Sequence, residues 1–403
     1  MIIRKAFRYR LEPTPEQTQL LSGAAGCVRF VWNRALSIQK SYLEQKCGIL
    51  SFGEMSKCLT NWRNGEAFSF LSESRVAPQQ QTLRFLDRAL LDAFNKKSPK
   101  KFPTFKKKGK KDSIRYPHPE RIKLDLQTED KDGRRIQQKI YLPKIGWVKF
   151  RLSRPIEGKI RNATVSREVD NWYISIQTER EVADPKHPSN SAIGADRGVA
   201  NLLTLSDGTF FAPITAFRDQ QLKLVKEQRR LARKKRHSVR WNRQKTKIAK
   251  LHQHVSAIRK NALHQISTII SKNHAVVVLE DLKVRNMTGS AKGTTEQPGK
   301  RIKQKAGLNK SILDQGWSIL QGMLDYKLRW LGGMLILVNP AFTSQTCSVC
   351  GHVDSGNRLE QAVFHCLHCG HDAHADLNAA QNILAKGTTA GHAGLACFTG
   401  ANL

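Results

Sequence analysis

Apolar and polar residues alternate over residues 2–11, which predicts a strand at the start of the chain. From Pro13 onward the apolar spacing becomes helical, and Pro15 followed by Glu16 is typical of a first helical turn. We therefore expect a strand followed by a helical region. Two stretches carry its apolar positions: Leu20, Leu21, Cys27, Phe30, Val31, Trp32, Ala35 and Leu36, then Leu83, Phe85, Leu86, Leu90, Leu91 and Phe94.

Short strands return after the helical region. Residues 140–142, 147–151, 160–165 and 172–177 have the composition and length of strands. Together with the N-terminal strand they predict a β-barrel-like domain made of residues 1–12 and 126–186. The helical segment 13–125 would then be an insertion in this barrel.

The second half shows a different pattern. A stretch rich in Pro, Ser and Asn at 185–191 marks a boundary, and beyond it apolar strands alternate with helices, as in α/β domains. Strands are expected up to Asp196, near residues 210–211, over 275–280 and over 333–338. A basic helical stretch spans 217–272, and further helices lie near 314–330 and 375–384. The fold class is thus multidomain α+β and α/β, with an α/β domain over 187–386 and a tail, 387–403, expected to be disordered.

The charge balance of the chain indicates its partner. Among 403 residues, 68 Lys and Arg face 33 Asp and Glu, a net charge of +35. A surface this positive repels itself unless a polyanion neutralises it, so nucleic acid is the first candidate. A ribosomal structural protein would have the same balance, so charge alone indicates no activity. No run of about 20 apolar residues occurs and the start lacks a signal-peptide core, so we expect a cytoplasmic protein without membrane partner.

Two basic segments are candidates for the nucleic-acid contact. In the loop at 96–116, Phe residues alternate with Lys, which suits stacking on bases beside phosphates, although a solvated linker would look similar. The helical stretch 217–272 suits a helical hairpin that packs by one edge and presents its cations to phosphates. It is almost entirely positive, whereas a solvated coiled coil normally mixes signs. The predicted contact residues are Lys106, Lys107, Lys108, Arg229, Arg230, Arg233, Lys234, Lys235 and Arg236.

Four of the eight cysteines are paired in sequence. Cys347 and Cys350 are followed, after fifteen intervening residues, by Cys366 and Cys369, the spacing of a four-cysteine zinc ribbon. Four thiolates leave no open coordination position, so the Zn²⁺ ion would be structural. Unmetallated thiols, or a nearby His replacing one Cys, are the alternatives. No structural disulfide is expected in a reducing compartment.

Three acidic residues occupy positions at the ends of elements. Asp196 and Glu280 each end an apolar strand, and Asp376 opens a helix. Acids at strand ends point toward the edge where α/β proteins bind ligands. Each acid also has a simpler explanation. Asp196 could be a turn residue, Glu280 the partner of a nearby Lys, and Asp376 a helix N-cap. Together they predict a catalytic cluster for two Mg²⁺ or Mn²⁺ ions about 3.5–4 Å apart, the arrangement used for phosphodiester hydrolysis.

Several motifs, in this order along the chain, resemble those of the TnpB family, transposon-encoded relatives of type V CRISPR nucleases. The resemblance covers nearly everything but the tail. The motifs are Tyr9-Arg10-Leu11-Glu12-Pro13-Thr14-Pro15-Glu16-Gln17, Phe30-Val31-Trp32-Asn33, Phe102-Pro103-Thr104-Phe105-Lys106, Gly194-x-Asp196-x-Gly198, Leu279-Glu280-Asp281-Leu282, Thr343-Ser344-Gln345-Thr346-Cys347 and Asp376-Leu377-Asn378-Ala379-Ala380-x-Asn382.

The resemblance implies an RNA-guided DNA endonuclease. Residues 187–386 would form a RuvC-like RNase H fold with Asp196, Glu280 and Asp376 as its acids and the zinc ribbon, 343–372, inserted. The first half would be a wedge-like β-barrel with an inserted helical recognition domain. It would bind a guide RNA from the transposon end and a short motif beside a double-stranded DNA target, so that base pairing supplies specificity. We expect a monomer without a small-molecule substrate. In one departure, His374-Ala375 replace the family's common Asp-Arg before Asp376.

Two other functions fit parts of the pattern. An RNA-guided repressor that binds DNA without cutting would be expected to have lost catalytic acids, and none is missing. A transposase that cuts and joins DNA could use the same fold. No Tyr nucleophile beside a His pair is evident, so the nuclease is the favoured hypothesis.

Overall fold

The computed structural model describes residues 1–127, 137–358 and 360–389. The chain divides into two compact units, Met1–Val182 and Ala183–Leu403. The division falls a few residues before the boundary expected at 186. Part of the range 126–186 and most of the tail, residues 390–403, lie outside the described residues; residues 387–389 continue the last helix.

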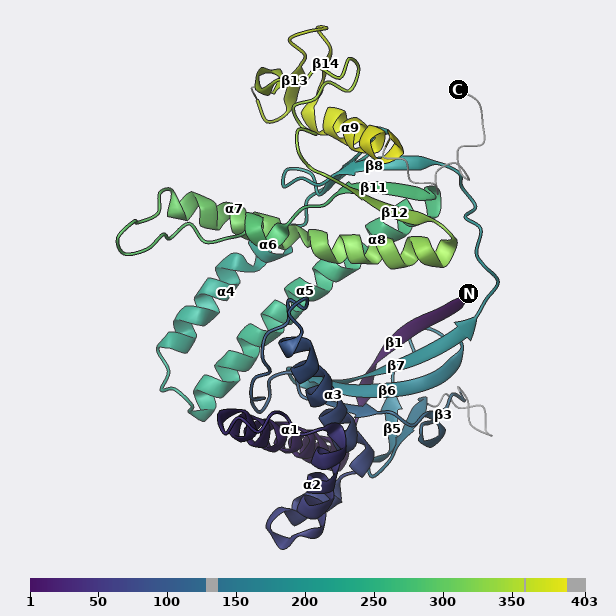
Figure 1. Cartoon of the computed structure of the whole chain (residues 1–403), viewed down its shortest axis with the longest axis vertical. Helices are drawn as coiled ribbons and strands as arrows, with labels where there is room; N and C mark the ends of the chain where they lie inside the picture. Colours follow the sequence, from purple (N-terminus) through teal and green to yellow (C-terminus); the bar gives the residue numbers. More distant parts are fainter. Residues whose placement is uncertain (128–136, 359, 390–403) are drawn as a thin grey trace. The chain divides into compact units, whose positions relative to one another are not determined.

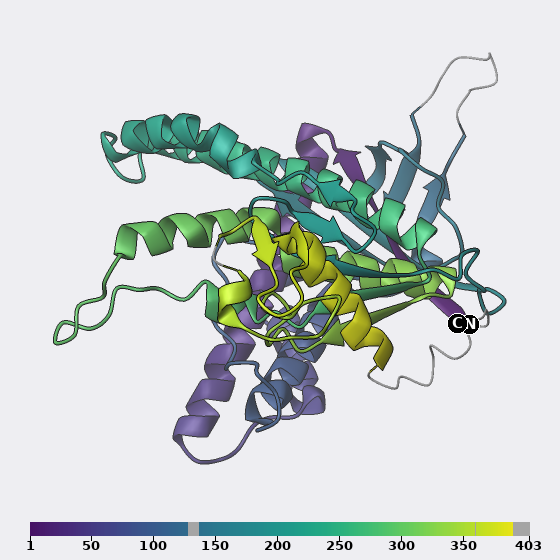
Figure 2. The same cartoon turned by 90° about the horizontal axis from the view of Figure 1, so that it is seen from above.

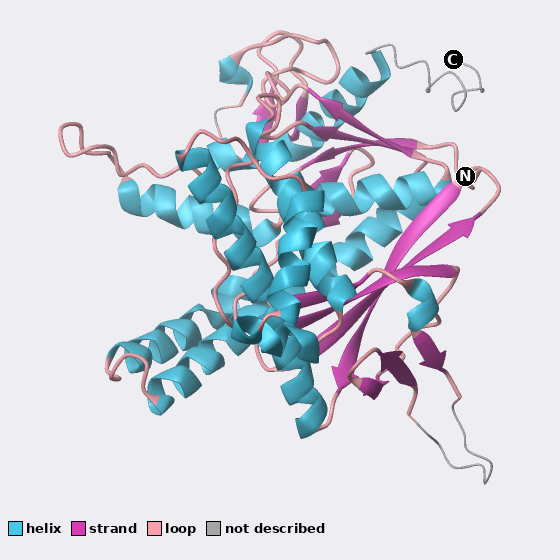
Figure 3. Cartoon of the chain, turned by 60° about the horizontal axis from the view of Figure 1, so that its bottom comes forward, coloured by secondary structure: helices cyan, strands magenta, loops and turns pink. Residues whose placement is uncertain are grey.

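The first unit is built on a seven-stranded sheet, whose strands are magenta in Figure 3. Its order is β2-β6-β7-β1-β5-β4-β3. The strands are β1 (Ile2–Glu12), β2 (Ser113–Tyr116), β3 (Lys123–Asp125), β4 (Lys139–Leu142), β5 (Gly146–Phe150), β6 (Lys159–Glu168) and β7 (Asn171–Glu181). In the part that the structure describes, the edge strands β2 and β3 do not pair, so the sheet is open and a closed barrel is not shown.

Strands β1, β4, β5, β6 and β7 confirm the strands expected from the sequence. One expectation needs correction. Strands β2 and β3 lie inside the range 13–125, which was expected to be a helical insertion. In β2, the side chains of Ile114 and Tyr116 are buried in the core of the sheet, so this segment pairs as a strand. Such a four-residue strand is too short to stand out from the surrounding Lys-rich loop by periodicity alone.

Helices α1 (Pro15–Glu44), α2 (Phe52–Asn64) and α3 (Val76–Phe94) form the rest of the first unit, with short 3₁₀ segments η1 (Glu66–Glu73) and η2 (Pro119–Arg121). Helix α1 begins with a capping box, in which the Thr14 side chain accepts from the Gln17 backbone and the Gln17 side chain accepts from the Thr14 N–H. Its first turns pack on the sheet through Leu21 and Val28. Its later turns pack on α2 and α3 through residues such as Leu36, so α1 joins two cores.

The second unit contains a five-stranded sheet of order β10-β9-β8-β11-β12. Strands β8 (Ala192–Asp196), β11 (Val276–Glu280) and β12 (Met334–Val338) are parallel, and β9 (Leu203–Leu205) and β10 (Phe210–Phe211) continue the sheet antiparallel. Val277 and Leu279 of β11 face the core formed with α5 (Val239–Asn273) and α8 (Trp317–Leu331), whereas Val276 and Val278 face α9 (Ala375–Thr389). Helices α8 and α9 lie on opposite sides of the sheet (Figure 1).

Helix α9 approaches the sheet closely because two glycines leave room for it. A Cβ atom on Gly194 would lie 2.2 Å from the carbonyl oxygen of Ala380. A Cβ on Gly387 would lie 2.6 Å from methyl carbons of Val278. Either contact is too short for an alanine, so the small residues set the position of α9, whose first turn carries Asp376.

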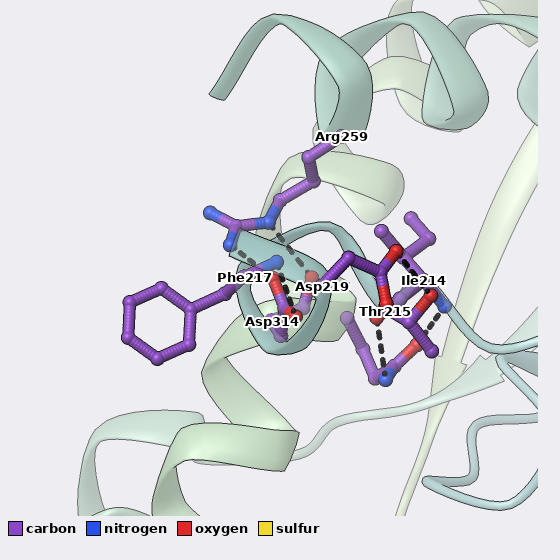
Figure 4. Close-up of polar contacts among 7 residues, drawn as sticks. Ile214, Thr215, Phe217, Asp219, Arg259 and Asp314 are labelled. Carbon is purple, nitrogen blue, oxygen red and sulfur yellow. Dashed lines mark hydrogen bonds and ion pairs between the residues drawn. The ribbon is translucent and has the colours of Figure 1, made fainter. Parts of the chain in front are cut away.

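Helix α4 (Ala216–Ala232) and α5 form the hairpin expected from the basic stretch, and they lie side by side in Figure 2. Helix α7 (Ile302–Gln315) holds the base of this hairpin (Figure 4). The carboxylate of Asp314, only 6% exposed, accepts the backbone N–H of Phe217 at 2.9 Å and pairs with the Arg259 guanidinium. Removing one partner of such a buried pair typically costs about 3–5 kcal/mol. Short elements complete the unit: α6 (Val284–Met287), η3 (Ser355–Asn357), β13 (Val363–His365) and β14 (Asp372–His374).

Within the described residues, no helix combines the length and the apolar character needed to cross a lipid bilayer.

Candidate active site and candidate metal centre

The three acids of the predicted catalytic cluster come from three elements of the second unit. Asp196 is the last residue of β8 and Glu280 is the last residue of β11. These strands are parallel neighbours in which Ala195 pairs with Leu279, so both acids leave the sheet at the same edge. Asp376 lies in the first turn of α9, which packs on β8. The fold thus brings together residues separated by up to 180 positions in sequence.

The electrostatics of Asp196 reflect this gathering of negative charge. Burial, followed by the charges of Glu280 and Asp376, raises the pKa of Asp196 to about 7, while Arg358 and a backbone hydrogen bond from Arg197 act in the opposite direction. A carboxyl whose pKa is raised by burial and by neighbouring acids is stabilised in its ionised form by a bound cation. The cluster therefore favours the binding of cations, and its oxygen donors suit hard divalent ions.

Neighbouring side chains hold the acids in place. Glu280 is 7% exposed and accepts a hydrogen bond from the hydroxyl of Thr343 at 2.6 Å. Buried Arg197 donates to the backbone carbonyl of Glu280 and, at 3.2 Å, to the side chain of Gln321. Burial lowers the pKa of the Arg197 guanidinium, while nearby acids, first Glu280, act against that change.

Asp376 has an arginine partner that comes from the cysteine-rich insertion. The Arg358 guanidinium lies 3.1 Å from Asp376 Oδ1 and donates to the carbonyl of Gln361 at 2.7 Å. Both members of the ion pair are mostly buried, with side chains 22% and 15% exposed. An arginine thus reaches the acid from a distant segment, although Ala375 stands where the motif commonly has one.

The four paired cysteines converge on one point. Sγ of Cys347 lies 3.7 Å from Sγ of Cys369, and Sγ of Cys350 lies 3.6 Å from Sγ of Cys366. A tetrahedral ion bound at about 2.3 Å by each sulfur separates the sulfurs by about 3.8 Å, so the group fits such an ion. Among the described cysteines, which exclude Cys397, all are free thiols, consistent with the absence of a structural disulfide expected there.

The two halves of the cysteine site have the same local structure. In each, the residue after the second Cys is a glycine with positive φ, Gly351 at +76° and Gly370 at +73°, which a residue with a side chain rarely adopts. Its N–H donates to the carbonyl of the first Cys of the pair, in both cases. Asn378 of α9 then joins the site to the helix, because it accepts the Ser348 N–H and donates to the Thr346 carbonyl, both at 2.8 Å.

The carboxylates are spread more widely than the thiols. Within residues 1–127, 137–358 and 360–389, the cysteines are the one group of three or more Cys, His, Asp or Glu side chains whose ligand atoms all lie within 4.8 Å of one another. The acids therefore influence one another by charge without forming a compact ligand set.

The predicted nucleic-acid contacts fall into two classes. Arg229, Arg230, Arg233, Lys235 and Arg236 are exposed at the end of α4 and in the turn that follows, and Lys234 is half-buried there. Arg230 also pairs with Glu227 at 2.7 Å. Lys107 and Lys108 are exposed. Lys106 differs, because its ammonium lies 3.9 Å from the centre of the Trp32 ring and burial lowers its pKa.

Comparison with known proteins places these features in a family. The chain is 46% identical over 393 residues to "Putative RNA-guided DNA endonuclease InsQ" of Escherichia coli (strain K12), which covers 98% of this chain and 94% of that protein. It is 33% identical, over 97% of its length and 91% of the relative, to a "Putative RNA-guided DNA endonuclease" of Streptomyces pristinaespiralis. The chain belongs to the TnpB family.

Three family models match parts of this TnpB chain. One described as "Probable transposase" matches residues 175–291, which include Asp196 and Glu280. One described as "Cas12f1-like, TNB domain" matches 317–383, which include the four cysteines and Asp376. A third, "Helix-turn-helix domain", matches 1–47, where the structure has strand β1 followed by the single long helix α1.

A solved structure supports the fold of the TnpB chain. The chain in "Cryo-EM structure of the Cas12f1-sgRNA-target DNA complex" aligns with a TM-score of 0.55 at 13% identity, covering 95% of this chain and 98% of that one. At this identity the likeness concerns the mixed α and β architecture alone.

Three residues that contact the acids of this TnpB protein were not predicted from the sequence: Thr343, Arg197 and Arg358. Thr343 and Arg197 lie inside or beside quoted motifs, so a contact to the acids could have been suspected. Nothing local marks Arg358, because it stands alone between the two cysteine pairs. Only the folded insertion brings it to Asp376.

Proposed function

We propose that this protein is an RNA-guided DNA endonuclease that hydrolyses phosphodiester bonds at the cluster of Asp196, Glu280 and Asp376. Membership of the TnpB family and the printed names of its relatives support the activity. The observation that carries the assignment of the site is the position of the acids: Asp196 and Glu280 end neighbouring parallel strands at one edge of the sheet, and Asp376 opens the helix that packs on β8. The pKa of Asp196, raised by burial and by the charges of the two other acids, agrees with a group of oxygen ligands that suits divalent cations.

The cofactors that fit the cluster are two Mg²⁺ or Mn²⁺ ions. When bound, such ions activate water and neutralise the charge that develops on the phosphate. The protein contributes the positions of the acids: Thr343 holds Glu280, and the Arg197 guanidinium holds the backbone at the end of β11. Arg358 pairs with Asp376 and would become available to a phosphate oxygen if cations occupied the carboxylates.

The architecture that we propose follows from the sheet of the second unit. A sheet with parallel strands β8, β11 and β12, antiparallel β9 and β10, and helices on both faces suits a RuvC-like RNase H fold over residues 187–386. The insertion at 343–372 would be a zinc ribbon with one structural Zn²⁺ on Cys347, Cys350, Cys366 and Cys369. In the first unit, the sheet would be the wedge-like domain and the α1–α3 region the recognition insertion.

The proposed partners are a guide RNA from the transposon end and a double-stranded DNA target beside a short flanking motif, bound by a monomer in the cytoplasm. The exposed cations of the α4–α5 hairpin are suited to phosphates, because they far outnumber its acids, Asp219 and Glu227. Sequence specificity would come from base pairing of the guide.

The test is to purify the protein from cells that carry its native locus and to sequence the RNA bound to it. The complex is then assayed in Mg²⁺ on a DNA library with randomised flanks, beside Asp196→Ala. Cleavage at guide-matched sites that is lost in the variant would support the proposal. Bound RNA without nicking in Mg²⁺ or Mn²⁺ would instead indicate a repressor, and strand joining without RNA would indicate a transposase.

A further inference from the structure

The loop that joins α3 to β2 in the first unit is fastened to helix α1 over three residues. The indole of Trp32 donates to the carbonyl of Thr104 at 3.0 Å. The side chain of Asn33 donates to the carbonyl of Lys106 at 3.0 Å and accepts the N–H of Lys106 at 2.8 Å. A side-chain amide that bonds both backbone groups of one residue fixes that residue as a neighbouring strand would.

The side chain of Lys106 adds to this attachment. Its ammonium lies over the Trp32 ring, so it serves to hold the loop on α1, and it is not a free cation on the surface. Lys106 is one of the predicted nucleic-acid contacts, and its contact with Trp32 also gives it a part in positioning the loop.

Phe105 stands between the two fastened residues and faces outward. Its side chain is 48% exposed, although Phe is a residue that folding usually buries. The ammonium of Lys40 lies 4.8 Å from the centre of its ring, and Lys107 and Lys108 follow as exposed cations. The result is an exposed aromatic ring on a rigid backbone, surrounded by positive charge.

We propose that Phe105 is a stacking platform for an unpaired base of the bound RNA, with Trp32, Asn33 and Lys106 as positioning residues. A ring accepts any base on its face, while the adjoining lysines bind the phosphates on either side. RNA is the partner that this ring suits, because proteins read RNA mainly at unstacked, single-stranded bases, whereas the bases of duplex DNA are already stacked. The inference rests on the proposed function, since it assigns part of the RNA contact.

The experiment compares binding of the full-length protein, freed of co-purified RNA, to three probes: an oligouridine RNA of about 12 nucleotides, an abasic ribose-phosphate strand of the same length, and a blunt RNA duplex. Phe105→Ala should weaken binding of oligouridine about 5- to 150-fold, the value of one base-aromatic stack. It should leave binding of the abasic strand and of the duplex unchanged. Phe105→Trp should restore the affinity.

Two variants test the surroundings of the ring. Phe94→Ala removes a ring of similar exposure, 52%, which packs against Phe102 at 6.1 Å, and should have no effect. Asn33→Leu should weaken oligouridine binding while Phe105 remains, because the loop loses both hydrogen bonds. The joint variant of Lys107→Ala and Lys108→Ala should weaken binding of all three probes, since phosphate contacts do not depend on bases.

The outcomes separate this inference from the proposed function. Equal affinity of wild type and Phe105→Ala for oligouridine, with guide-directed cleavage intact, would overturn the inference alone. Equal losses of affinity of Phe105→Ala for all three probes would also overturn the stacking role. A loss in Phe94→Ala as large as that in Phe105→Ala would overturn it too. A wild-type protein that binds no single-stranded RNA would overturn the proposed function together with the inference.

Discussion

The two clusters of candidate metal ligands in the second unit are built in opposite ways. The thiols of Cys347, Cys350, Cys366 and Cys369 come from two short segments with the same turn, and their sulfurs already have the spacing of tetrahedral ligands. The carboxylates of Asp196, Glu280 and Asp376 come from two strands and a helix. They are more widely spread, and their mutual repulsion contributes to the raised pKa of Asp196.

The difference fits the two roles that we propose for these sites. A set of four thiolates is complete with one ion and leaves no position for a substrate, so it suits a structural role. A set of hard oxygen ligands that is short of positive charge gains most when cations arrive with a negatively charged substrate, which suits catalysis. Arg358 connects the two, because the cysteine-rich insertion carries it to Asp376.

The strongest test of the comparison removes one carboxylate charge without changing its shape. Glu280→Gln should reduce cleavage of guide-matched DNA about 1000-fold or more, since metal-bound charge stabilises such transition states by several kcal/mol. The amide oxygen can still accept from Thr343, so the fold should persist. The measurement is a single-turnover cleavage rate in saturating Mg²⁺.

Asp325→Asn is the matched control for that variant. Asp325 lies in the same unit, is 44% exposed and pairs with Arg329, and its loss should leave the rate unchanged. A Glu280→Gln protein that cleaves at the wild-type rate would exclude the carboxylate cluster as the active site.

Arg358 tests whether the two clusters act together. Arg358→Ala should slow cleavage about 100-fold, the usual effect of removing one donor that faces developing charge. The pKa of Asp196 should rise further, because Arg358 is one of the few groups that lower it. Arg358→Lys should recover part of the rate through its charge, although it cannot form the same paired hydrogen bonds. Equal rates in all three proteins would mean that Arg358 only supports the insertion.

Removal of the structural metal should have a smaller effect on cleavage than loss of a carboxylate. Cys366→Ser should abolish stoichiometric zinc, measured by elemental analysis, and slow cleavage about 10- to 100-fold, as changes around a metal site commonly do. The reason is indirect: the insertion would no longer hold Arg358 beside Asp376. Cys47→Ser, at an exposed thiol outside the cluster, is the control. Retention of one zinc per chain in Cys366→Ser would contradict the four-thiolate site.

The pH dependence of cleavage tests Asp196 itself. At low Mg²⁺ the cleavage rate should rise about tenfold per unit up to pH about 7 and then level off, because metal binds the ionised form of Asp196. Raising the Mg²⁺ concentration should move this midpoint to lower pH, since metal and proton compete for the same oxygen. A midpoint that does not respond to Mg²⁺ would assign the titration to another group.

The same carboxyl affects folding stability in the absence of metal. Its pKa is higher in the folded protein than in the unfolded chain, so the folded state binds the proton more tightly and its advantage is lost as pH rises from about 4 to 7. In EDTA, Asp196→Asn should therefore lose less stability than wild type between pH 5 and pH 8. Thermal unfolding at both pH values measures the difference, and equal losses in the two proteins would contradict it.

The sequence by itself determined the features that depend on local order. The Cys spacing predicted the thiol cluster, because each pair needs only neighbouring residues. Apolar periodicity predicted the helices α1, α4 and α5, and an unbroken apolar run predicted β11, which is buried at every residue. The strands of the first sheet were predicted in part, while short β2 and β3 were missed because so few residues carry little periodic signal.

Only the tertiary structure decided the features that depend on distant segments. It brought Arg358 to Asp376, turned Lys106 toward Trp32 and left Phe105 exposed, and none of these follows from spacing along the chain. In the described part of the chain, the edge strands of the first sheet do not pair, where strand composition had suggested a barrel. The physical reason is the same in each case: the partner of a charged or aromatic side chain is chosen by which elements pack together, and periodicity records only that an element is buried, not against what.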